Sequence, residues 1–256
     1  PALQVVLPLL AAPLTVLLRR PGPAFVVAVA TSWCALAVAL ALAMQVHGSG
    51  TLSYAIGSWP PPLGIEYRVD ALSSLMLVLV AGTASVVLPF ARGSIEREIP
   101  PPQHYLFYTM FLLCLTGLLG ISITGDAFNI FVFLEISSLS TYVLIALSRD
   151  RRALVAAYQY LIMGTIGATF IVIAIGLLYL MTGTLNLADL GGRLGSVAGT
   201  RPVLAALAFL TVGVSLKAAL FPLHQWLPGA YAYAPSAVSA FVAATATKVA
   251  VYVLLR

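Results

Sequence analysis

The sequence predicts an all-α, polytopic membrane protein with about eight transmembrane helices. Of its 256 residues, 61% are hydrophobic and 8% are charged, and the mean hydropathy is +1.03. A soluble domain has about a quarter of its residues charged, so water is not the main solvent of this chain. Charge-poor stretches of about 20 residues, the length that crosses a bilayer core, recur from one end of the sequence to the other.

Eight apolar segments account for these helices, and polar or Pro- and Gly-rich breaks separate them. The segments are Ala2–Leu18, Pro23–Val46, Val69–Ala91, Tyr105–Ile123, Asp126–Leu147, Ala153–Met181, Val203–Leu227 and Ser236–Leu255. The first has no basic stretch before it and no small-residue cleavage site after it, so we expect a true span and not a signal peptide.

Arginines are distributed unevenly between the breaks, and this fixes the expected orientation. The breaks after the first, third and fifth segments contain seven of them, whereas those after the second, fourth and sixth contain three: Arg68, Arg193 and Arg201. Loops on the cytoplasmic side carry the excess of positive charge. We therefore expect a multi-pass protein of the cell (inner) membrane with its N-terminus on the periplasmic or outer side.

Very few ionisable side chains lie inside the predicted spans. The only two lysines, Lys217 and Lys248, fall within them, and of the eight acids only Glu135 sits deep in one. A charged side chain at the bilayer centre costs roughly 2.5–3.5 kcal/mol on insertion scales, so such residues normally pair inside the bundle and mark an ion path. These three residues are the first candidates for a functional site.

Glu135 lies about halfway along the fifth span, nine residues after Asp126. Its side chain is too short to reach the interface, and helical spacing places Phe131, Ser138 and Tyr142 on the same face. The carboxylate therefore begins a partly polar stripe. The alternative is a structural carboxyl group bonded to a neighbouring helix.

Lys217 precedes Pro222 by five residues, and Pro228 follows. Proline at 222 offers no N–H to the carbonyl of Ala218, so we expect the helix to kink or unwind beside the lysine. A broken helix at membrane depth is tolerated where it is buried in protein or lines a watery cavity. The alternative is that the lysine reaches the interface with its long side chain.

His224 and Lys248 complete the candidates for proton transfer. Helical spacing places His224 two turns beyond Lys217 on the same face, and an imidazole suits a proton relay, although an interfacial hydrogen-bonding role is equally open. Lys248 lies deep in the last span with Ala244, Thr245 and Tyr252 around it, and packing alone explains it poorly. Its alternative is again a side chain that extends to the interface.

Other polar and small residues have structural interpretations. Three aspartates at span ends, Asp70, Asp126 and Asp189, are expected to cap helix N-termini. Small residues on the sixth span are expected to let helices approach closely: Gly164, Gly167, Ala168 and Gly176.

No cofactor or catalytic site is predicted. Cys34 and Cys114 lie in separate apolar segments without metal-ligand spacing, and His47 and His104 fall at opposite membrane faces. Phosphate-binding loops are absent from the sequence, and sequence order identifies no Ser/His/Asp set. The formal net charge of +5 reflects the orientation of the protein in the membrane, because the arginines sit in short loops between spans. It predicts no nucleic-acid partner.

The segments that carry these charges resemble a known family. The runs are GDAFNIFVFLE at 125–135, TGTLN at 182–186, SLKAALFPLHQWLP at 215–228, APSAVSA at 234–240 and TKV at 247–249. They are similar to the antiporter-like, proton-translocating subunits shared by Mrp-type cation/proton antiporters, respiratory complex I and membrane-bound hydrogenases. The resemblance covers nearly the whole chain and is greatest to the D-type subunit of Mrp antiporters.

The resemblance implies an architecture for this chain. Family members have about fourteen helices, three initial ones followed by two inverted five-helix repeats. Residues 1–103 would then hold the three initial helices and residues 104–256 the first repeat, with a discontinuous seventh helix and a proton half-channel. The second repeat is expected to be absent from this chain. Glu135 and Lys217 would form a buried ion pair, and Lys248 would be the next proton carrier.

The resemblance also implies a function. It points to a transport subunit without a catalytic site of its own. This subunit would move protons, with or without sodium or potassium. Its partners would be other membrane subunits of an Mrp, complex I-like or hydrogenase complex. A place in a redox-driven, NADH dehydrogenase-like translocase stays open. The alternatives are a membrane scaffold subunit of a respiratory oxidoreductase without transport of its own, and a redox subunit that binds quinone or a metal.

The expected orientation can be tested by labelling single introduced cysteines. We predict that a cysteine near Arg151 reacts with a membrane-impermeant reagent only from the cytoplasmic side, and one near Gly195 only from outside, because the arginine excess follows the odd-numbered spans. The background would lack Cys34 and Cys114. The opposite labelling pattern would reverse the assigned topology.

Overall fold

The computed structural model describes residues 1–256 and is built almost entirely of helices. In chain order the elements are α1 (Leu3–Leu18), α2 (Pro21–Ser49), β1 (Leu52–Ala55), a 3₁₀ turn (Ile56–Ser58), β2 (Glu66–Val69), α3 (Ala71–Glu98), a 3₁₀ turn (Pro101–Gln103), α4 (His104–Ile123), α5 (Ala127–Ala146), α6 (Arg151–Thr182), α7 (Leu187–Val197), α8 (Arg201–Ala218), α9 (Trp226–Tyr233) and α10 (Ser236–Leu255). Seven of the helices are long and apolar enough to cross a membrane, and α1 is apolar but has only 16 residues.

The predicted apolar segments correspond to α1 to α6, α8 and α10, which confirms the all-α membrane class. One boundary differs clearly: α3 continues past Ala91 to Glu98, so that Arg92 and Arg97 lie in its last turns and not in a loop. The segment predicted at 203–227 is interrupted after Ala218. Two short helices, α7 and α9, and the β1–β2 hairpin were not predicted, because a search for long apolar segments does not detect such short elements.

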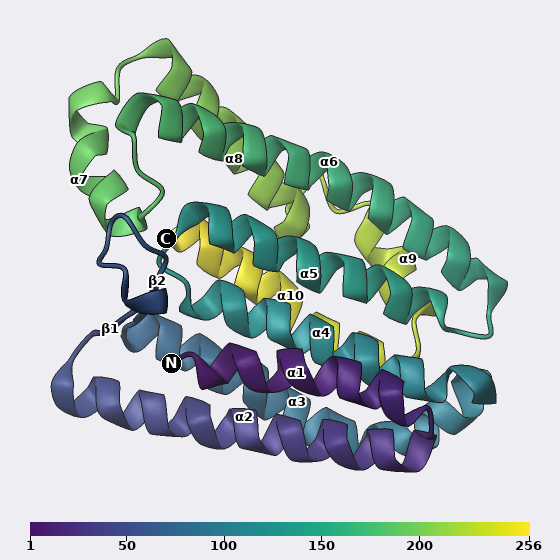
Figure 1. Ribbon diagram of the computed structural model, residues 1–256. Helices are drawn as coiled ribbons and strands as arrows, with labels where there is room; N and C mark the ends of the chain where they lie inside the picture. Colours follow the sequence, from purple (N-terminus) through teal and green to yellow (C-terminus); the bar gives the residue numbers. More distant parts are fainter.

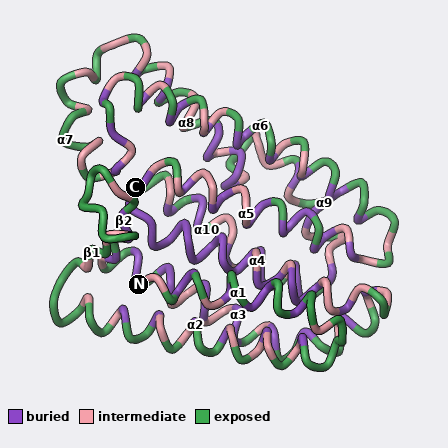
Figure 2. Tube along the Cα trace, in the orientation of Figure 1, coloured by how far each residue is buried: buried purple, intermediate pink, exposed green.

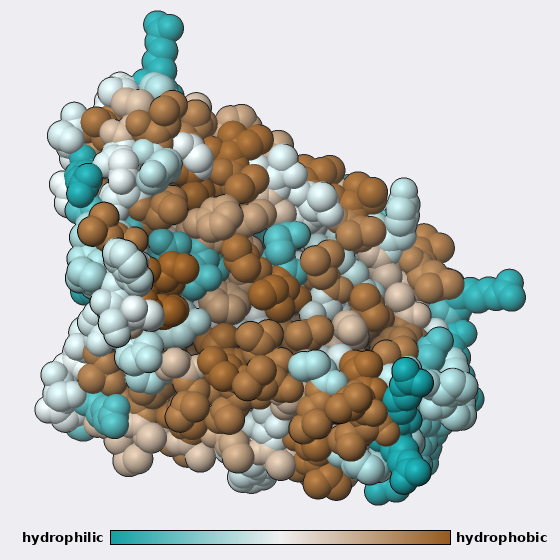
Figure 3. Space-filling view, viewed as in Figure 1, coloured by the Kyte–Doolittle hydropathy of each residue, from teal (hydrophilic) through white to brown (hydrophobic).

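The long helices run side by side, and α4 is the central one (Figure 1). It packs against α5, α1, α3 and α2, and most of its residues are buried, whereas α2 and α6 face outward over much of their length (Figure 2). Apolar side chains cover most of the face shown in Figure 3, and hydrophilic ones gather mainly at the ends of the bundle. This distribution suits helices whose sides meet lipid and whose ends meet water.

Helix N-termini are capped largely as the sequence predicts. Asp70 and Asp126 each accept a bond from the backbone N–H three residues later, at 2.9 and 2.7 Å. Asp189 is not a cap: Asn186 caps α7, and Asp189 pairs with Arg193 one turn further along the same helix. The prediction failed there because the helix begins two residues earlier than the aspartate.

The hairpin ties together two connections at the end of the bundle that carries both chain ends. The buried carboxylate of Glu66 accepts bonds from Ser53 Oγ at 2.5 Å and Asn186 Nδ2 at 2.8 Å. The carbonyl of Glu66 accepts the N–H of Gly125 at 2.8 Å. One residue thus joins the α4–α5 connection to the start of α7, and every polar atom involved has a partner.

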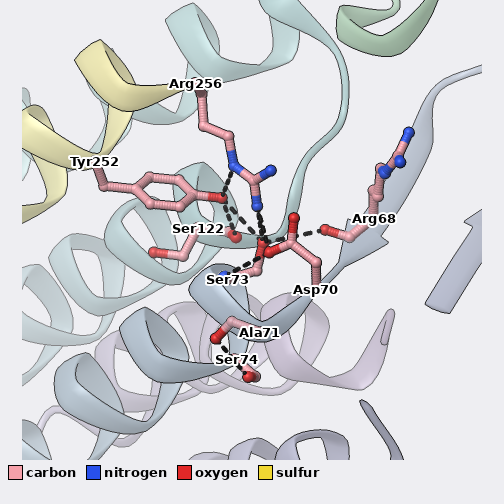
Figure 4. A network of polar contacts seen from close by, with 8 residues as sticks. All are labelled: Arg68, Asp70, Ala71, Ser73, Ser74, Ser122, Tyr252 and Arg256. Atoms are coloured by element: carbon pink, nitrogen blue, oxygen red, sulfur yellow. Dashed lines mark hydrogen bonds and ion pairs between the residues drawn. The ribbon is translucent and has the colours of Figure 1, made fainter. Parts of the chain in front are cut away.

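A second polar network links α3, α4 and α10 at the same end (Figure 4). Arg256 donates to Asp70 and to Ser73, both at 2.6 Å, and Tyr252 Oη donates to the carbonyl of Ser122 at 3.0 Å. Partial burial raises the pKa of Asp70, but the hydrogen bonds from Arg256 and the Ser73 amide outweigh it and bring the pKa to about 2. Its stabilising contribution is therefore complete above the ordinary value of 3.8 and is lost as the pH falls through about 2.

Helices α6 and α8 approach each other through two glycines. A Cβ atom at Gly213 would lie 2.7 Å from the carbonyl oxygen of Gly167 and 3.1 Å from the backbone nitrogen of Ile171. Gly164 similarly leaves room for the hydroxyl of Tyr142 on α5. The predicted role of the small residues is confirmed at these positions but is wrong at Gly176, which faces open space.

This close approach predicts different effects for the same substitution at two glycines. Gly213→Ala should lower the free energy of unfolding by about 1–3 kcal/mol, because backbone atoms of α6 must move. Gly176→Ala should be neutral or stabilising by about 0.5–1 kcal/mol, since alanine favours the helix and meets nothing. Thermal unfolding in one detergent would compare them, and equal midpoints would contradict the packing.

Candidate functional site

The structure brings Glu135 and Lys217 together between the middle of α5 and the end of α8. Lys217 Nζ lies 3.3 Å from Glu135 Oε1 and 2.8 Å from Ser138 Oγ. The lysine side chain is only 4% exposed and that of the glutamate is 25% exposed. A charged group taken out of water needs a partner with good geometry, and here each of the two residues is the partner of the other. The pair also satisfies the predicted placement of both residues within spanning helices.

Helical spacing on α5 explains why a serine joins the pair. Ser138 follows Glu135 by three residues, so both side chains lie on one face and meet the same ammonium group. The predicted polar stripe continues to Tyr142, which is 6% exposed and whose hydroxyl has no hydrogen-bond partner. Phe131, also expected on this face, is only half buried and takes no part in the polar contacts.

The helix that carries Lys217 ends one residue later, as Pro222 led us to expect. Ala219 adopts a left-handed conformation with φ of 55°, and the chain resumes a helix only at Trp226. The indole Nε1 of Trp226 donates to the carbonyl of Leu216 at 3.0 Å. A carbonyl at the end of α8 thus receives a donor from beyond the break, although Leu220 and Phe221 within the break are exposed.

A small cavity lies beside the ammonium group. Its volume is about 20 Å³, enough for about one water molecule, and side chains from α4, α5, α6, α8 and α10 enclose it. Its polar lining consists of Lys217, Ser137, Ser138, Thr141 and Tyr160. Of these five residues, only Lys217 and Ser138 had been singled out from the sequence. The hydroxyl residues crowded into the apolar α5 were the signal for Ser137 and Thr141, whereas nothing local pointed to Tyr160.

Three aromatic rings fill the space between this cavity and α9. Tyr160 stacks on Trp226 with ring centroids 3.9 Å apart and planes 3° apart, and Tyr142 meets Tyr160 edge-on at 4.7 Å. Offset and edge-on aromatic contacts add to the stabilisation that burial provides. The cluster therefore couples the position of α9 to the wall of the lysine's cavity.

His224 does not share a helical face with Lys217, because the helix ends between them. It lies in the turn that connects α8 to α9, with its ring 5.6 Å from that of Phe221. Its Nδ1 is buried and has no hydrogen-bond partner. The expectation based on seven-residue spacing was wrong, since such spacing holds only in a continuous helix.

Lys248 lies in α10, but on the outside of this bundle. Its Nζ donates to the carbonyl of Ala243 on its own helix at 2.5 Å, and the side chain is exposed. It lines an otherwise mostly apolar groove of about 390 Å³ together with residues of α3, α8 and α10: Leu72, Met76, Ala218, Thr247, Val251, Tyr252 and Leu255. The next residues, Val249 and Ala250, line the inner cavity. Helix α10 and the end of α8, where Lys217 lines the cavity and Ala218 the groove, therefore lie between the two spaces.

Known membrane proteins share sequence with this chain over much of its length. A sequence profile described as NADH:quinone oxidoreductase/Mrp antiporter, transmembrane, matches residues 124–256. The chain is 45% identical to the N-type subunit of NADH-quinone oxidoreductase from Desulforudis audaxviator, over the whole chain and 51% of that protein. It is 32% identical to the D-type subunit of the Na⁺/H⁺ antiporter from Alkalihalophilus pseudofirmus, over 86% of the chain and 44% of that protein. The similarity to an N-type subunit thus exceeds that to this D-type subunit, against our expectation.

A solved structure shares the fold across the whole chain. The structure of the membrane-bound sulfane sulfur reductase, an archaeal respiratory membrane complex, contains a chain that superposes with a TM-score of 0.91 and 29% identity. The match covers 100% of the present chain and 52% of that chain. The chain thus spans about half the length of the relatives that it matches.

The bond across the helix break gives a testable consequence. Trp226→Phe keeps a stacked ring but removes the donor to the carbonyl of Leu216, so it should lower the free energy of unfolding by about 1–3 kcal/mol. Trp33→Phe on the outer face of α2 is the matched control and should change it by less than about 0.5 kcal/mol. Equal losses in a denaturation series would show that the indole N–H does not support the break.

Proposed function

Because the chain belongs to the NADH:quinone oxidoreductase/Mrp antiporter transmembrane family, we propose that it is a proton-translocating, antiporter-like subunit of a multisubunit Mrp, complex I-like or hydrogenase-type complex. One observation carries the proposal: a lysine and a glutamate lie 3.3 Å apart within the spanning helices, beside a helix break and a water-sized cavity. Buried ionisable pairs of this kind are typical of proton paths.

The pair offers a way to hold and release a proton. An adjacent carboxylate favours the charged form of an amine, and a dry apolar environment favours the neutral form. Lys217 already bonds to both Glu135 and Ser138, so a small rotation would exchange the carboxylate for the serine and the cavity. Motion of the segment after Ala218 is the natural cause of such a rotation, since that segment is not held by a continuous helix.

Lys248 is the next proton carrier in this proposal, and His224, in the turn between α8 and α9, is a further one. A proton that moves from the cavity at Lys217 to the groove at Lys248 must pass α10 and the end of α8. The exposure of Lys248 among apolar side chains supports a path that continues across this face into another membrane segment. Residues 104–256 then form the half-channel, and residues 1–103 form its flanking helices.

The assignment to the inner membrane, with the N-terminus outside, belongs to the same proposal. It is supported by the seven arginines that lie at one end of the bundle, in and around the α1–α2, α3–α4 and α5–α6 connections. In that orientation the α8–α9 break opens toward the cytoplasm. Protons, with or without exchanged sodium or potassium, would enter from that side.

A double-mutant cycle tests the shared switch. Glu135→Gln and Lys217→Ala should each reduce proton transport by about tenfold or more in the assembled complex, because either change leaves its partner alone in the same step. The double variant should be little worse than either single one, since residues that act as a unit are strongly non-additive. Proton uptake into proteoliposomes at matched expression would be measured in all four forms.

The partly exposed pair of Asp189 and Arg193 on α7, away from the cavity at Lys217, provides the control cycle. Asp189→Asn, Arg193→Gln and their combination should leave transport near the original level, because a surface ion pair contributes little. Independent, multiplicative losses at Glu135 and Lys217 would count against a shared switch. Full transport in either single variant would favour the alternative of a membrane scaffold without transport of its own.

A further inference from the structure

Helix α5 carries a run of hydroxyl side chains beside the ion pair, and two of them are bonded differently from the rest. Three donate to a carbonyl three or four residues earlier on the same helix, at 2.7–2.9 Å: Ser137, Ser140 and Thr141. Ser138 instead accepts a bond from Lys217 Nζ at 2.8 Å, and its own hydroxyl proton has no acceptor. The hydroxyl of Tyr142 is buried and has no partner. Two hydroxyl groups near the lysine thus keep unused hydrogen-bonding capacity.

The position of the Tyr142 hydroxyl is set by a glycine on the neighbouring helix. Tyr142 is 6% exposed, and a Cβ atom at Gly164 on α6 would lie 1.8 Å from its Oη. Any residue other than glycine would therefore displace the hydroxyl. A buried hydroxyl without a bond destabilises a protein, and nearly all such groups in native structures are bonded. This position therefore indicates a partner that becomes available in another state of the site.

Ser138 is the partner that α5 offers. It precedes Tyr142 by four residues, so the two side chains lie one turn apart on the same face of the helix. Their hydroxyl groups are close, but they lack the geometry of a hydrogen bond while Ser138 accepts from the lysine. A hydroxyl group both donates and accepts, whereas an ammonium group only donates. Ser138 is therefore able to reverse its role when the lysine loses a proton.

A neutral amine has a lone pair, so neutral Lys217 accepts the unused proton of Ser138 as a hydrogen bond. The oxygen of Ser138 then lacks a donor, and Tyr142 is placed to supply one. We propose that Tyr142 is a positioning residue that donates to Ser138 only when Lys217 is neutral, and so stabilises that form. Each hydroxyl keeps its hydrogen and changes only its partner. This inference deepens the proposed function and rests on its premise that Lys217 releases a proton.

Few other groups near Lys217 respond to pH. Glu135 on α5 is the charged residue that contacts it, and Tyr160 on α6 is a titratable side chain in the cavity wall. The walls from α4 and α10 are apolar: Leu118, Ile121, Ala246, Val249 and Ala250. The remaining titratable side chains nearby form no hydrogen bond with the ammonium group: Cys114 on α4, His224 in the turn after α8, Tyr231 on α9 and Lys248 on α10. A titration of Lys217 is therefore affected by one charged neighbour, Glu135.

Nuclear magnetic resonance of the lysine side chain tests the proposal, because the chain contains only two lysines. With Lys248→Arg as the background, the nitrogen-15 resonance of Lys217 Nζ would be titrated in phospholipid nanodiscs. Tyr142→Phe removes a bond made only to the neutral form. Lys217 should then keep its proton to a pH higher by about 0.5–1 unit, the size expected for one hydrogen bond. Gly164→Ala keeps the hydroxyl but displaces it, and should move the titration midpoint in the same direction.

The matched control is Tyr108→Phe, because Tyr108 is similarly buried but lies on α4 outside the cavity wall. It should leave the midpoint unchanged. Tyr142→Phe should not lower the melting temperature, since it removes a hydroxyl that has no bond in the ion-paired state. A midpoint that is unchanged or lower in Tyr142→Phe, or an equal rise in Tyr108→Phe, would overturn the proposal. The titration involves no transport, and the transport of the Glu135 and Lys217 variants tests the proposed function alone, so the two fail separately.

Discussion

The bond between Lys217 and Glu135 is the interaction around which the site is arranged. An ammonium group in the apolar interior of the bundle requires a partner from another helix, which fixes α5 against α8 at this height. The glycine contact between α6 and α8 then lets the helix that carries the lysine come close to the rest of the bundle. The pair is thus held by backbone packing as well as by charge.

The interruption after Ala218 is the second requirement of the same region. A helix that continued past Lys217 would need an N–H at Pro222, which proline does not have; the structure ends α8 at Ala218, and beyond the break the indole of Trp226 donates to the carbonyl of Leu216. Because Trp226 also stacks on Tyr160, the break is braced by the wall of the lysine's cavity. A movement of α9 would therefore displace the residues around the ammonium group of Lys217 through a short series of direct contacts.

The two ends of the bundle are fastened by carboxylates that act across helices. At one end Glu66 joins the hairpin to two connections. At the other, Glu98 at the end of α3 accepts from the backbone N–H of Ser236 at 2.5 Å and from its hydroxyl at 2.6 Å, and so caps α10 from a different helix. Glu98 thus fixes the start of α10, and the bonds of Arg256 to Asp70 and of Tyr252 to Ser122 fix its end, with one face toward the inner cavity and Lys248 on the outer one.

The sequence by itself determined the membrane class, the order of the spanning helices and the break beside Lys217. It also identified the three charged residues within the spans, Glu135, Lys217 and Lys248. These features could be predicted because hydropathy, proline chemistry and the cost of intramembrane charge act locally along the chain. The tertiary structure alone decided which of these residues meet. It joined Lys217 to Glu135 and Ser138, removed His224 from the expected face and turned Lys248 outward. Distances between helices depend on side chains far apart in the sequence, and no periodicity within one segment records them.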